Sequence, residues 1–455
     1  MHARMRVHGS SNCSIRMVQT ARLRPSLDTI PRIRLTNFAA RTRPLSDLRM
    51  ASTTTETSQK PHDDPENTIH ILGLGNIGKY VAHALRKHNP DLPITLLFHK
   101  RVMLGAWQKE GQTITSIRQS PQLDERNGQG GFNIELLGNL PKGAKSESTS
   151  QGPIRNLIVA TKSYRTATAI KPLKHRLDKD SNILFLQNGM GASDKVSQRW
   201  FPDQENRPTY YAGICSAGVN SPPEEVFSFI HAGLGPLIVG RTDVMVWRLV
   251  SHQAPSPADN SLVRALHEAS PTLMTTLTNP TDIYVEQLKK LAINAIINPL
   301  TAIFGCRNGE VFGTHQRIKI IKDLISKEIG PTLRTLVPRS LPPEQAHIFD
   351  DDQLFATAQQ VAEKTAANFS SMLQDTRQGK QTEIDFILGY LSRWAAKRKI
   401  PRPQIYRMIG LMGEIKPRYY QKEEGKCITD SGEPFCSFVW PGIDWSKEVP
   451  VQAKL

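Results

Sequence analysis

The sequence predicts a Rossmann-type α/β domain followed by an all-helical domain, and three observations lead to this fold class. A glycine motif, G-L-G-N-I-G at 73–78, lies between a short apolar strand and a helix-like segment. Further short apolar segments recur up to about residue 240, as in an open sheet. From about residue 265 the pattern changes to helices only. We therefore expect an active site in the cleft between two domains.

The length and composition of the chain limit the classes of protein to consider. Its 455 residues have room for two or three domains with a sizeable core. No apolar run reaches the roughly 18 residues of a membrane helix, so no membrane partner is expected. The five cysteines are scattered, without C-x-x-C spacing or nearby histidines, which predicts neither a disulfide framework nor a metal site.

The N-terminal segment is unusually rich in arginine. Residues 1–50 hold ten arginines, no lysine and two aspartates, so half of the net charge of +16 lies there. This composition is typical of a mitochondrial transit peptide. The alternatives are a disordered basic tail, or a cytoplasmic protein if translation starts at Met50. Because the charge is concentrated in this segment, overall basicity is weak evidence for nucleic-acid binding, and none is expected.

The glycine motif has the context that a dinucleotide-binding site requires. It directly follows the strand at 68–72 and opens a helix that runs to His88. Gly73 would allow the tight turn, Gly75 the approach of a pyrophosphate, and Gly78 the packing of helix on strand. The free N–H groups of the helix N-terminus would face the phosphates. The alternative is a chance glycine turn. The cofactor-binding candidates are Gly73, Leu74, Gly75, Asn76, Ile77 and Gly78.

The second strand, 94–98, indicates which cofactor is used. It ends in His99, Lys100 and Arg101 instead of an acidic residue. An Asp or Glu there would bind the ribose hydroxyls of NAD and repel a 2′-phosphate, so the missing acid favours NADPH. The alternative is a solvated basic strand end.

Two polar residues follow later strands of the predicted sheet. Residues 105–152 are expected to form short strands, with a flexible insertion near 139–152. Further strands are expected at 156–161, 183–186, 210–219 and 234–240, the last of which would close the sheet. Lys162 and Asn188 follow the first two of these strands, at the edge where ligands bind in a parallel sheet. Alternatively, Lys162 is a surface cap and Asn188 belongs to an ordinary Asn-Gly turn.

The predicted organisation has four parts. Residues 1–66 are the targeting segment and linker, 67–264 the NADP-binding domain, 265–425 the helical catalytic domain, and 426–455 a tail. An irregular Pro/Ser-rich piece falls within 241–262. Helices are expected at 283–304, 315–336, 353–376, 382–399 and 403–415.

The first of these helices carries the main catalytic candidate. Lys290, Asn294 and Asn298 are four residues apart, so they share one helix face. The other positions are almost all apolar, which predicts a buried helix. Burial lowers the pKa of a lysine toward the range where it gives up a proton. Alternatively, Lys290 reaches solvent and Asn298 helps to end the helix before Pro299.

Two later features fit the same cleft. Asn368 and Ser371 are three residues apart and would share a helix face. Glu383 follows Thr382, a good N-cap, with Asp385 three residues after the cap. The alternatives are solvent exposure for Asn368 and Ser371, and for Glu383 a carboxylate placed favourably in the helix dipole.

With these residues collected, the sequence resembles the 2-dehydropantoate 2-reductase (ketopantoate reductase) family from about residue 68 to 420. The shared motifs are G-L-G-N-I-G at 73–78, T-K at 161–162, Q-N-G-M-G at 187–191, K-L-A-I-N-A-I-I-N-P-L-T-A-I at 290–303, R-N-G-E at 307–310, N-F-S-S-M-L-Q-D at 368–375 and T-E-I-D at 382–385. The long central block is far more specific than the glycine motif. The resemblance implies a 6-phosphogluconate-dehydrogenase-like pair of domains. The N-terminal extension, the two insertions and the tail beyond 425 depart from the pattern.

The resemblance also implies roles for single residues. It makes Lys290 the proton donor, with Glu383 ordering the substrate or the cofactor ribose. Arg101 would meet the 2′-phosphate, and Lys162 and Asn188 would contact the cofactor, with Asn188 also reaching the substrate. The residues implied to bind 2-dehydropantoate are Asn294, Asn298, Asn308 and Ser371, with Asn368 nearby. A last cofactor-contacting position falls near Val219, where the residue differs from the family's.

The implied activity is NADPH-dependent reduction of 2-dehydropantoate to pantoate, a step toward pantothenate and coenzyme A. A homodimer is left open. One alternative is a reductase of another branched 2-keto acid. The other is a non-catalytic mitochondrial binding or RNA-associated relative, which would have lost Lys290, Glu383 or the glycines, and none is lost here.

Overall fold

The computed structural model describes residues 64–120, 123–137, 152–242 and 253–420, together with short pieces of the tail up to residue 451. Almost all of the predicted targeting segment and linker lies outside the described residues, as do most of the insertion near 139–152 and the middle of 241–262. None of the described helices combines the length and the apolar character needed to cross a membrane.

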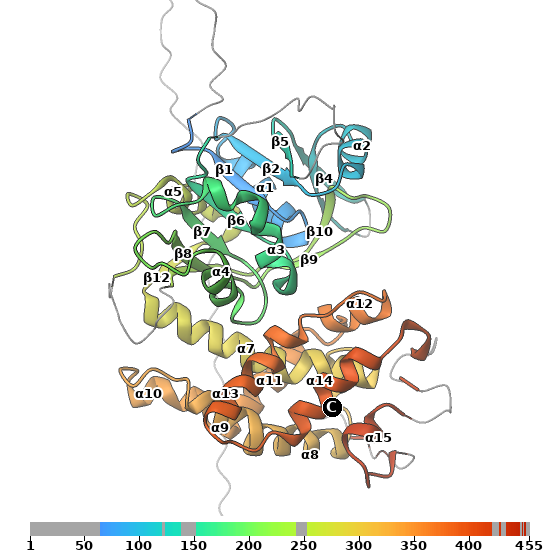
Figure 1. Ribbon diagram of the computed structural model, residues 1–455. Coiled ribbons are helices and arrows are strands. Elements are labelled where there is room, and N and C mark those ends of the chain that lie inside the picture. The colour runs from blue at the N-terminus through green and yellow to red at the C-terminus, as the bar shows by residue number, and fades with distance from the viewer. Residues whose placement is uncertain are drawn as a thin grey trace, which may run out of the picture. The chain divides into compact units, whose positions relative to one another are not determined.

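Eight strands form one sheet in the order β12-β11-β8-β7-β6-β1-β2-β5 (Figure 1). The strands are β1 (Ile69–Leu72), β2 (Ile94–Phe98), β5 (Asn133–Leu136), β6 (Asn156–Val159), β7 (Asn182–Phe185), β8 (Thr209–Cys215), β11 (Leu237–Arg241) and β12 (Thr276–Thr278). Neighbours are parallel except that β11 runs antiparallel to β8. The order reverses between β1 and β6, which is where a doubly wound sheet binds its ligand. The predicted α/β class is therefore confirmed.

The central strands are short and apolar because both faces of the sheet are covered. Ile69 and Ile71 point into one cluster with the helices α1, α5 and α6, whereas Leu72 points into a second cluster on the opposite face. The helices of this part are α1 (Asn76–His88), α2 (Val102–Lys109), α3 (Thr166–Ile170), α4 (Ala192–Trp200), α5 (Ser261–Glu268) and α6 (Ser270–Leu273), with 3-10 turns η1 (Ser163–Arg165) and η2 (Lys171–Arg176).

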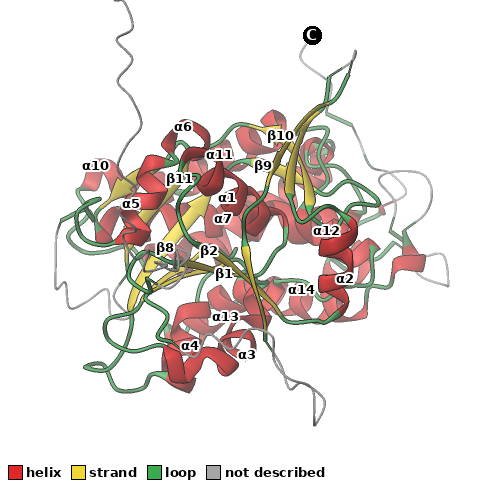
Figure 2. Ribbon diagram, turned by 90° about the horizontal axis from the view of Figure 1, so that it is seen from above, coloured by secondary structure: helices red, strands yellow, loops and turns green. Residues whose placement is uncertain are grey.

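A second, smaller sheet of order β4-β3-β10-β9 packs on α1 (Figure 2). Its strands are β3 (Ile114–Arg118), β4 (Glu125–Gln129), β9 (Gly218–Asn220) and β10 (Ser228–Gly233). The sequence analysis did not predict β10 or the helix α2. The expectation that residues from 105 onward form strands is wrong at its start, because α2 buries Trp107 as a helical side chain.

The remaining helices form a separate all-helical part, as predicted (Figure 1). They are α7 (Pro280–Phe304), α8 (His315–Leu324), α9 (Gly330–Arg334), α10 (Pro343–Ala346), α11 (Asp351–Lys364), α12 (Ser371–Arg377), α13 (Leu388–Lys397), α14 (Pro403–Glu414) and α15 (Cys436–Val439). The short 3-10 turns between them are η3 (Gly309–Phe312), η5 (His347–Phe349), η6 (Ile384–Phe386) and η7 (Pro417–Tyr419), and a π-helical segment, η4 (Ile325–Ile329), joins α8 to α9.

The helix α7 lies at the centre of this part because it is apolar on nearly every side. It begins where the side chain of Asn279 accepts a hydrogen bond from the backbone of Asp282, with Pro280 in the first turn. It ends at Gly305, whose φ of 72° suits a glycine cap. The helix passes through Pro299 without ending, so the alternative that Asn298 helps to end it is wrong.

Four expectations about the second half of the chain are wrong. The helix predicted at 353–376 is broken into α11 and α12. The side chain of Ser370 accepts a hydrogen bond from the backbone nitrogen of Leu373 and so caps a new helix. Asn368 therefore precedes α12 and does not share a helix face with Ser371. The helix predicted at 382–399 starts as η6, and Thr382 does not cap it. Finally, β12 adds a strand beyond β11, in a stretch where only helices were predicted.

Candidate active site

The three glycines of the turn after β1 have different steric environments. Gly73 has a φ of 104°, and a Cβ there would lie 2.6 Å from the backbone nitrogen of Thr161. A Cβ on Gly78 would lie 1.9 Å from the carbonyl oxygen of Gly73, so helix and turn touch. A Cβ on Gly75 would meet nothing within 4 Å, which leaves that side of the turn open.

The open side of this turn fits the pyrophosphate of a dinucleotide. The helix α1 begins at Asn76, and no side chain caps its first N–H groups. Such a helix start binds anions through its N–H groups and its dipole. Leu74 and Ile77 are half-buried and pack against the apolar cluster beneath the turn. All six residues predicted from the motif therefore lie in one compact turn at the switch point of the sheet.

The end of β2 carries positive charge. His99, Lys100 and Arg101 are all exposed there, and Arg101 is the residue before α2. Partial burial lowers the pKa of His99, and the charges of Lys100 and Arg165 lower it further. Arg165, which the sequence analysis did not select, therefore adds to the basic cluster. A 2′-phosphate would be attracted to this end of the strand.

Lys162 lies at the end of β6, where it meets two carboxylates from the helical part. Its Nζ is 2.6 Å from Oδ2 of Asp375 and 4.0 Å from Oε2 of Glu383. Burial alone would lower the pKa of Lys162, but the charges of Glu383 and Asp375 outweigh it and raise the pKa above its usual value. Lys162 is therefore a fixed cation, and the alternative of a loose surface cap is wrong.

Glu383 is buried, with 6% of its surface exposed, and its carboxylate turns toward the sheet. Oε1 accepts hydrogen bonds from the backbone nitrogen of Ser163 at 2.8 Å and lies 2.7 Å from the Ser163 hydroxyl. That hydroxyl also lies 2.6 Å from the carbonyl oxygen of Asn188, so two acceptors share one hydrogen. The side-chain amide of Asn188 donates to Oε2 at 3.4 Å. Glu383 is thus held by η1 and by the loop that follows β7, and the alternative of a carboxylate placed only for the dipole of its own helix is wrong.

The turn after β7 is pressed against η6. Gly189 has a φ of 76°, and a Cβ there would lie 2.3 Å from the carbonyl oxygen of Phe386. The backbone nitrogen of Met190 donates to the same oxygen at 2.8 Å. The turn that carries Asn188 is therefore a contact between the sheet and the helical part, beyond what an ordinary surface turn requires.

Lys290 projects from α7 toward the end of β8. Its Nζ donates to the carbonyl oxygen of Cys215 at 3.0 Å. Burial lowers the pKa of Lys290, while the nearby Cys215 thiol and Glu383 carboxylate act in the opposite direction. The side chain as a whole is half-buried. The direction of the pKa shift is the one that the sequence analysis expected, and the alternative of an amine in open solvent is wrong.

Asn294 and Asn298 follow Lys290 on the same helix, one and two turns further on. Asn294 is half-buried and Asn298 is 8% exposed. Within the described structure, the side-chain amide of neither residue makes a hydrogen bond. Both amides therefore keep donors and acceptors for a small polar molecule beside Lys290.

The other three predicted substrate residues lie around the start of α12. Asn308 is buried, donates from Nδ2 to Thr365 at 2.9 Å, and leaves Oδ1 buried without a partner in the described structure. Its backbone nitrogen donates to the carbonyl oxygen of Asn368, whose side chain is exposed. Ser371 is exposed at the first position of α12, one turn before Asp375 and on the same side of the helix.

The structure brings together Lys162, Asn188, Lys290 and Glu383, and adds three residues that the sequence analysis missed. These are Ser163, Cys215 and Asp375. Asp375 had a signal, because it closes the N-F-S-S-M-L-Q-D block and stands four residues after Ser371. Among the described residues, no cluster of His, Cys, Asp and Glu side chains is suited to hold a metal ion.

A dinucleotide turn at the switch point of a Rossmann sheet, met by a lysine from a helical domain, places the chain among the two-domain nicotinamide-dependent reductases. The family model described as ketopantoate reductase PanE/ApbA matches residues 69–243, and the model of its C-terminal part matches residues 282–416. The chain belongs to the ketopantoate reductase family, a family of nicotinamide-dependent keto-acid reductases.

Individual relatives agree with this assignment. The chain is 31% identical to the probable 2-dehydropantoate 2-reductase of Schizosaccharomyces pombe, over 72% of this chain and 91% of the relative. It is 26% identical to the ketoisovalerate reductase of Gibberella fujikuroi, over 73% of this chain and 79% of the relative.

Two solved structures share the fold. The probable 2-dehydropantoate 2-reductase of Bacillus subtilis has a TM-score of 0.54 at 24% identity, over 77% of this chain and all of that one. A D-mandelate dehydrogenase with NADH has a TM-score of 0.56 at 16% identity, over 76% of this chain and 98% of that one. At these identities the likeness concerns the fold alone.

Proposed function

We propose that the chain reduces 2-dehydropantoate to pantoate with NADPH. The observation that carries the proposal is the position of Lys290. Its amine reaches from the helical part to the end of β8 and lies within electrostatic range of Glu383. Such a partly desolvated ammonium group can stabilise negative charge on an oxygen and then deliver a proton.

The chemistry divides between the cofactor and the protein. The nicotinamide, when bound, supplies the hydride for the carbon of the 2-keto group. Lys290 would hold the keto oxygen by a charge-assisted hydrogen bond and protonate it as the alcohol forms. This general acid catalysis is worth roughly 10²–10⁴-fold in rate. Because burial lowers the pKa of Lys290, the proton is easier to release than from a lysine in water.

The remaining residues would bind and orient the substrate. The free amides of Asn294 and Asn298 lie along α7 beside Lys290, at the spacing of successive helix turns. Asn188 and Glu383 are joined by a hydrogen bond, and Asn308 has an unsatisfied buried oxygen. Ser371 lies one helix turn before Asp375, which is paired with Lys162. The Ser371 hydroxyl would hydrogen-bond the substrate carboxylate. Orientation of this kind contributes further to the rate.

The first test replaces Lys290 in the purified protein. Lys290→Ala should lower kcat for 2-dehydropantoate by at least about a hundredfold, because the general acid is lost. NADPH binding, measured by nucleotide fluorescence, should survive. The matched control is Lys289→Ala, since Lys289 is the adjacent lysine and is engaged with Glu286 at 2.6 Å. Near-normal turnover of Lys290→Ala would refute the catalytic assignment.

The runner-up function is reduction of another branched 2-keto acid, supported by the relative named ketoisovalerate reductase. Ketoisovalerate lacks the hydroxymethyl group of 2-dehydropantoate, so the two substrates separate the functions. If polar side chains hold the hydroxyl, kcat/KM should favour 2-dehydropantoate by at least about a hundredfold. Equal or reversed values, with Lys290→Ala still inactive, would keep the mechanism and change the substrate.

A further inference from the structure

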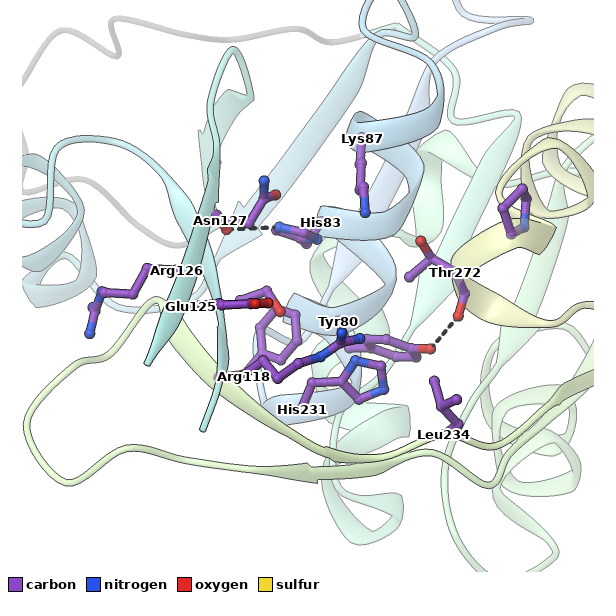
Figure 3. Close-up of a pocket in the computed structure, with 13 residues that line it drawn as sticks. Tyr80, His83, Lys87, Arg118, Glu125, Arg126, Asn127, His231, Leu234 and Thr272 are labelled. Carbon is purple, nitrogen blue, oxygen red and sulfur yellow. Dashed lines mark hydrogen bonds between the residues drawn. The ribbon is translucent and has the colours of Figure 1, made fainter. Parts of the chain in front are cut away.

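A cavity of about 400 Å³ lies between α1 and the smaller sheet (Figure 3). Its walls come from α1, β3, β4, β10 and the start of α6. A volume of this order matches the pockets that hold small metabolites. None of the residues assigned above to the cofactor or the substrate lines it.

The charged side chains around this cavity are mostly basic. Lys87 and Arg118 line it, and in the described structure neither has a hydrogen-bond or ion-pair partner. Arg126 also lines the cavity but is already paired with Glu225 at 2.5 Å. The only acid among the described lining residues is Glu125, the cross-strand neighbour of Arg118. Positive charge therefore exceeds negative charge around the cavity.

One buried polar atom in the wall has no partner. Nε2 of His231 is buried and makes no hydrogen bond in the described structure. By contrast, the Tyr80 hydroxyl donates to the carbonyl oxygen of Thr272, and His83 contacts the carbonyl oxygen of Asn127. His231 lies against the Tyr80 ring, with centroids 5.2 Å apart, and beside Arg118 in Figure 3. An unsatisfied buried nitrogen is costly, so a ligand that bonds to it would be favoured.

One side of the wall is apolar. The rings of Tyr80 and Phe229 meet edge to face, with centroids 5.9 Å apart. Leu234 and Pro271 complete this side, and Leu234 is 73% exposed. A ligand suited to this cavity thus combines an anionic group with a flat or apolar body.

The hairpin of β9 and β10 links the cavity to the glycine turn. His231 on β10 stands opposite Val219 on β9. The carbonyl oxygen of Val219 accepts a hydrogen bond from Nδ2 of Asn76 at 3.3 Å, and Ser221 donates to Oδ1 of Asn76 at 2.7 Å. Asn76 is the first residue of α1, in the predicted pyrophosphate site. A shift of the hairpin would therefore move Asn76 within the predicted pyrophosphate site.

We propose that this cavity is a regulatory site for a small metabolite that bears a carboxylate or phosphate group on an apolar body. Lys87 and Arg118 hold the anionic group, and His231 completes its hydrogen bonds. Tyr80 and Phe229 cover the apolar body. Occupation of the site changes the affinity for the nicotinamide cofactor through β9 and β10.

The test uses the full chain saturated with NADPH, so that phosphate subsites for the cofactor are already filled. Phenyl phosphate and benzoate are titrated by calorimetry at constant ionic strength, with inorganic phosphate and benzyl alcohol as comparison probes. Phenyl phosphate or benzoate should bind, and the stronger of the two identifies the anion that the site prefers. Absence of binding by both, or equal binding of inorganic phosphate, would overturn the proposal.

Two variants locate the binding. Arg118→Gln and His231→Gln should each weaken the better probe by about tenfold or more, because each removes a hydrogen bond to a charged group. Arg118 has no partner in the described structure, so its replacement should leave the fold intact. Lys109→Gln removes an equal charge from the exposed end of α2 and should have no effect. Unchanged binding by Arg118→Gln would place the probe elsewhere and refute the site.

The proposed effect of the ligand on cofactor affinity is tested by a separate measurement. The Kd of NADPH is measured by fluorescence with and without a saturating concentration of the better probe. It should change at least about threefold in the wild-type protein and stay constant in Arg118→Gln. An unchanged Kd in the wild-type protein, despite probe binding, would refute the coupling.

Discussion

The buried His70 makes a quantitative prediction about stability against pH. It lies on β1 and is 4% exposed. Two residues of the strand, Ile71 and Leu72, separate it from the glycine turn. Burial, assisted by the charge of Arg176, lowers its pKa from 6.5 to about 4. Nδ1 has no partner in the described structure, and a hydrogen bond to the backbone of Asn156 offsets only part of the cost of a charged ring.

The sign and size follow from this pKa. In the unfolded chain His70 takes up a proton near pH 6.5, whereas in the folded chain it stays neutral down to about pH 4. The stability contributed by the neutral ring is therefore present above pH 6.5 and is lost as the pH falls. At pH 5 the loss is about 2 kcal/mol, and below pH 4 it approaches about 3 kcal/mol.

Urea unfolding of the wild-type protein and of His70→Leu, at pH 7.5 and pH 5, measures this loss. Other histidines also have lowered pKa values, so the informative quantity is the change in the difference between the two proteins. The wild-type protein should lose about 2 kcal/mol more than the variant on acidification. The control is Thr95→Val, which alters the neighbouring strand position without a titratable group. An equal loss in wild type and His70→Leu would refute the reasoning.

Three further predictions concern the cofactor, Lys162 and the helical part. Arg101→Gln should reduce the preference for NADPH over NADH in kcat/KM by about tenfold, because a charged hydrogen bond to the 2′-phosphate is lost, and an unchanged ratio would contradict this role. Asp375→Asn removes one cause of the raised pKa of Lys162, so the pKa of the Lys162 amine, followed by NMR titration, should fall, and an unchanged pKa would count against the pair. Glu328→Gln should lower the free energy of unfolding by about 1–2 kcal/mol, since its buried carboxylate accepts the backbone N–H groups at the start of α14, whereas the exposed Glu344→Gln should not.

The parts of the fold that depend on local pattern could be predicted from the sequence. The turn from β1 into α1 is specified by three glycines within six residues, and α7 by its apolar surface and end signals. The break between α11 and α12 was not predicted, because the helical pattern continues through it. Ser370 caps α12 locally, and the contact of its hydroxyl with Thr301 comes from a distant part of the chain. The pairing of β3 with β10 likewise joins segments far apart in the chain.

The same division holds within the candidate site. Lys162 and Asn188 could be placed because parallel strands end at one edge of a sheet. The environment of Glu383 could not, because its partner Ser163 lies 220 residues earlier in the chain. The local alternative for Glu383 was a role in the dipole of its own helix, and the structure shows a long-range hydrogen bond to Ser163 instead.

The seating of α7 against the sheet sets the reach of its lysine. Ile283, two turns before Lys290 and on the same side of the helix, packs so closely on Gly240 that a Cβ there would lie 2.6 Å from the isoleucine Cβ. Ile283 is fixed on β11, so the length of helix between Ile283 and Lys290 determines where the lysine amine lies. A single residue inserted into it would swing the amine by about 100° around the helix axis. Length, as well as composition, is thus a constraint on this segment of the chain.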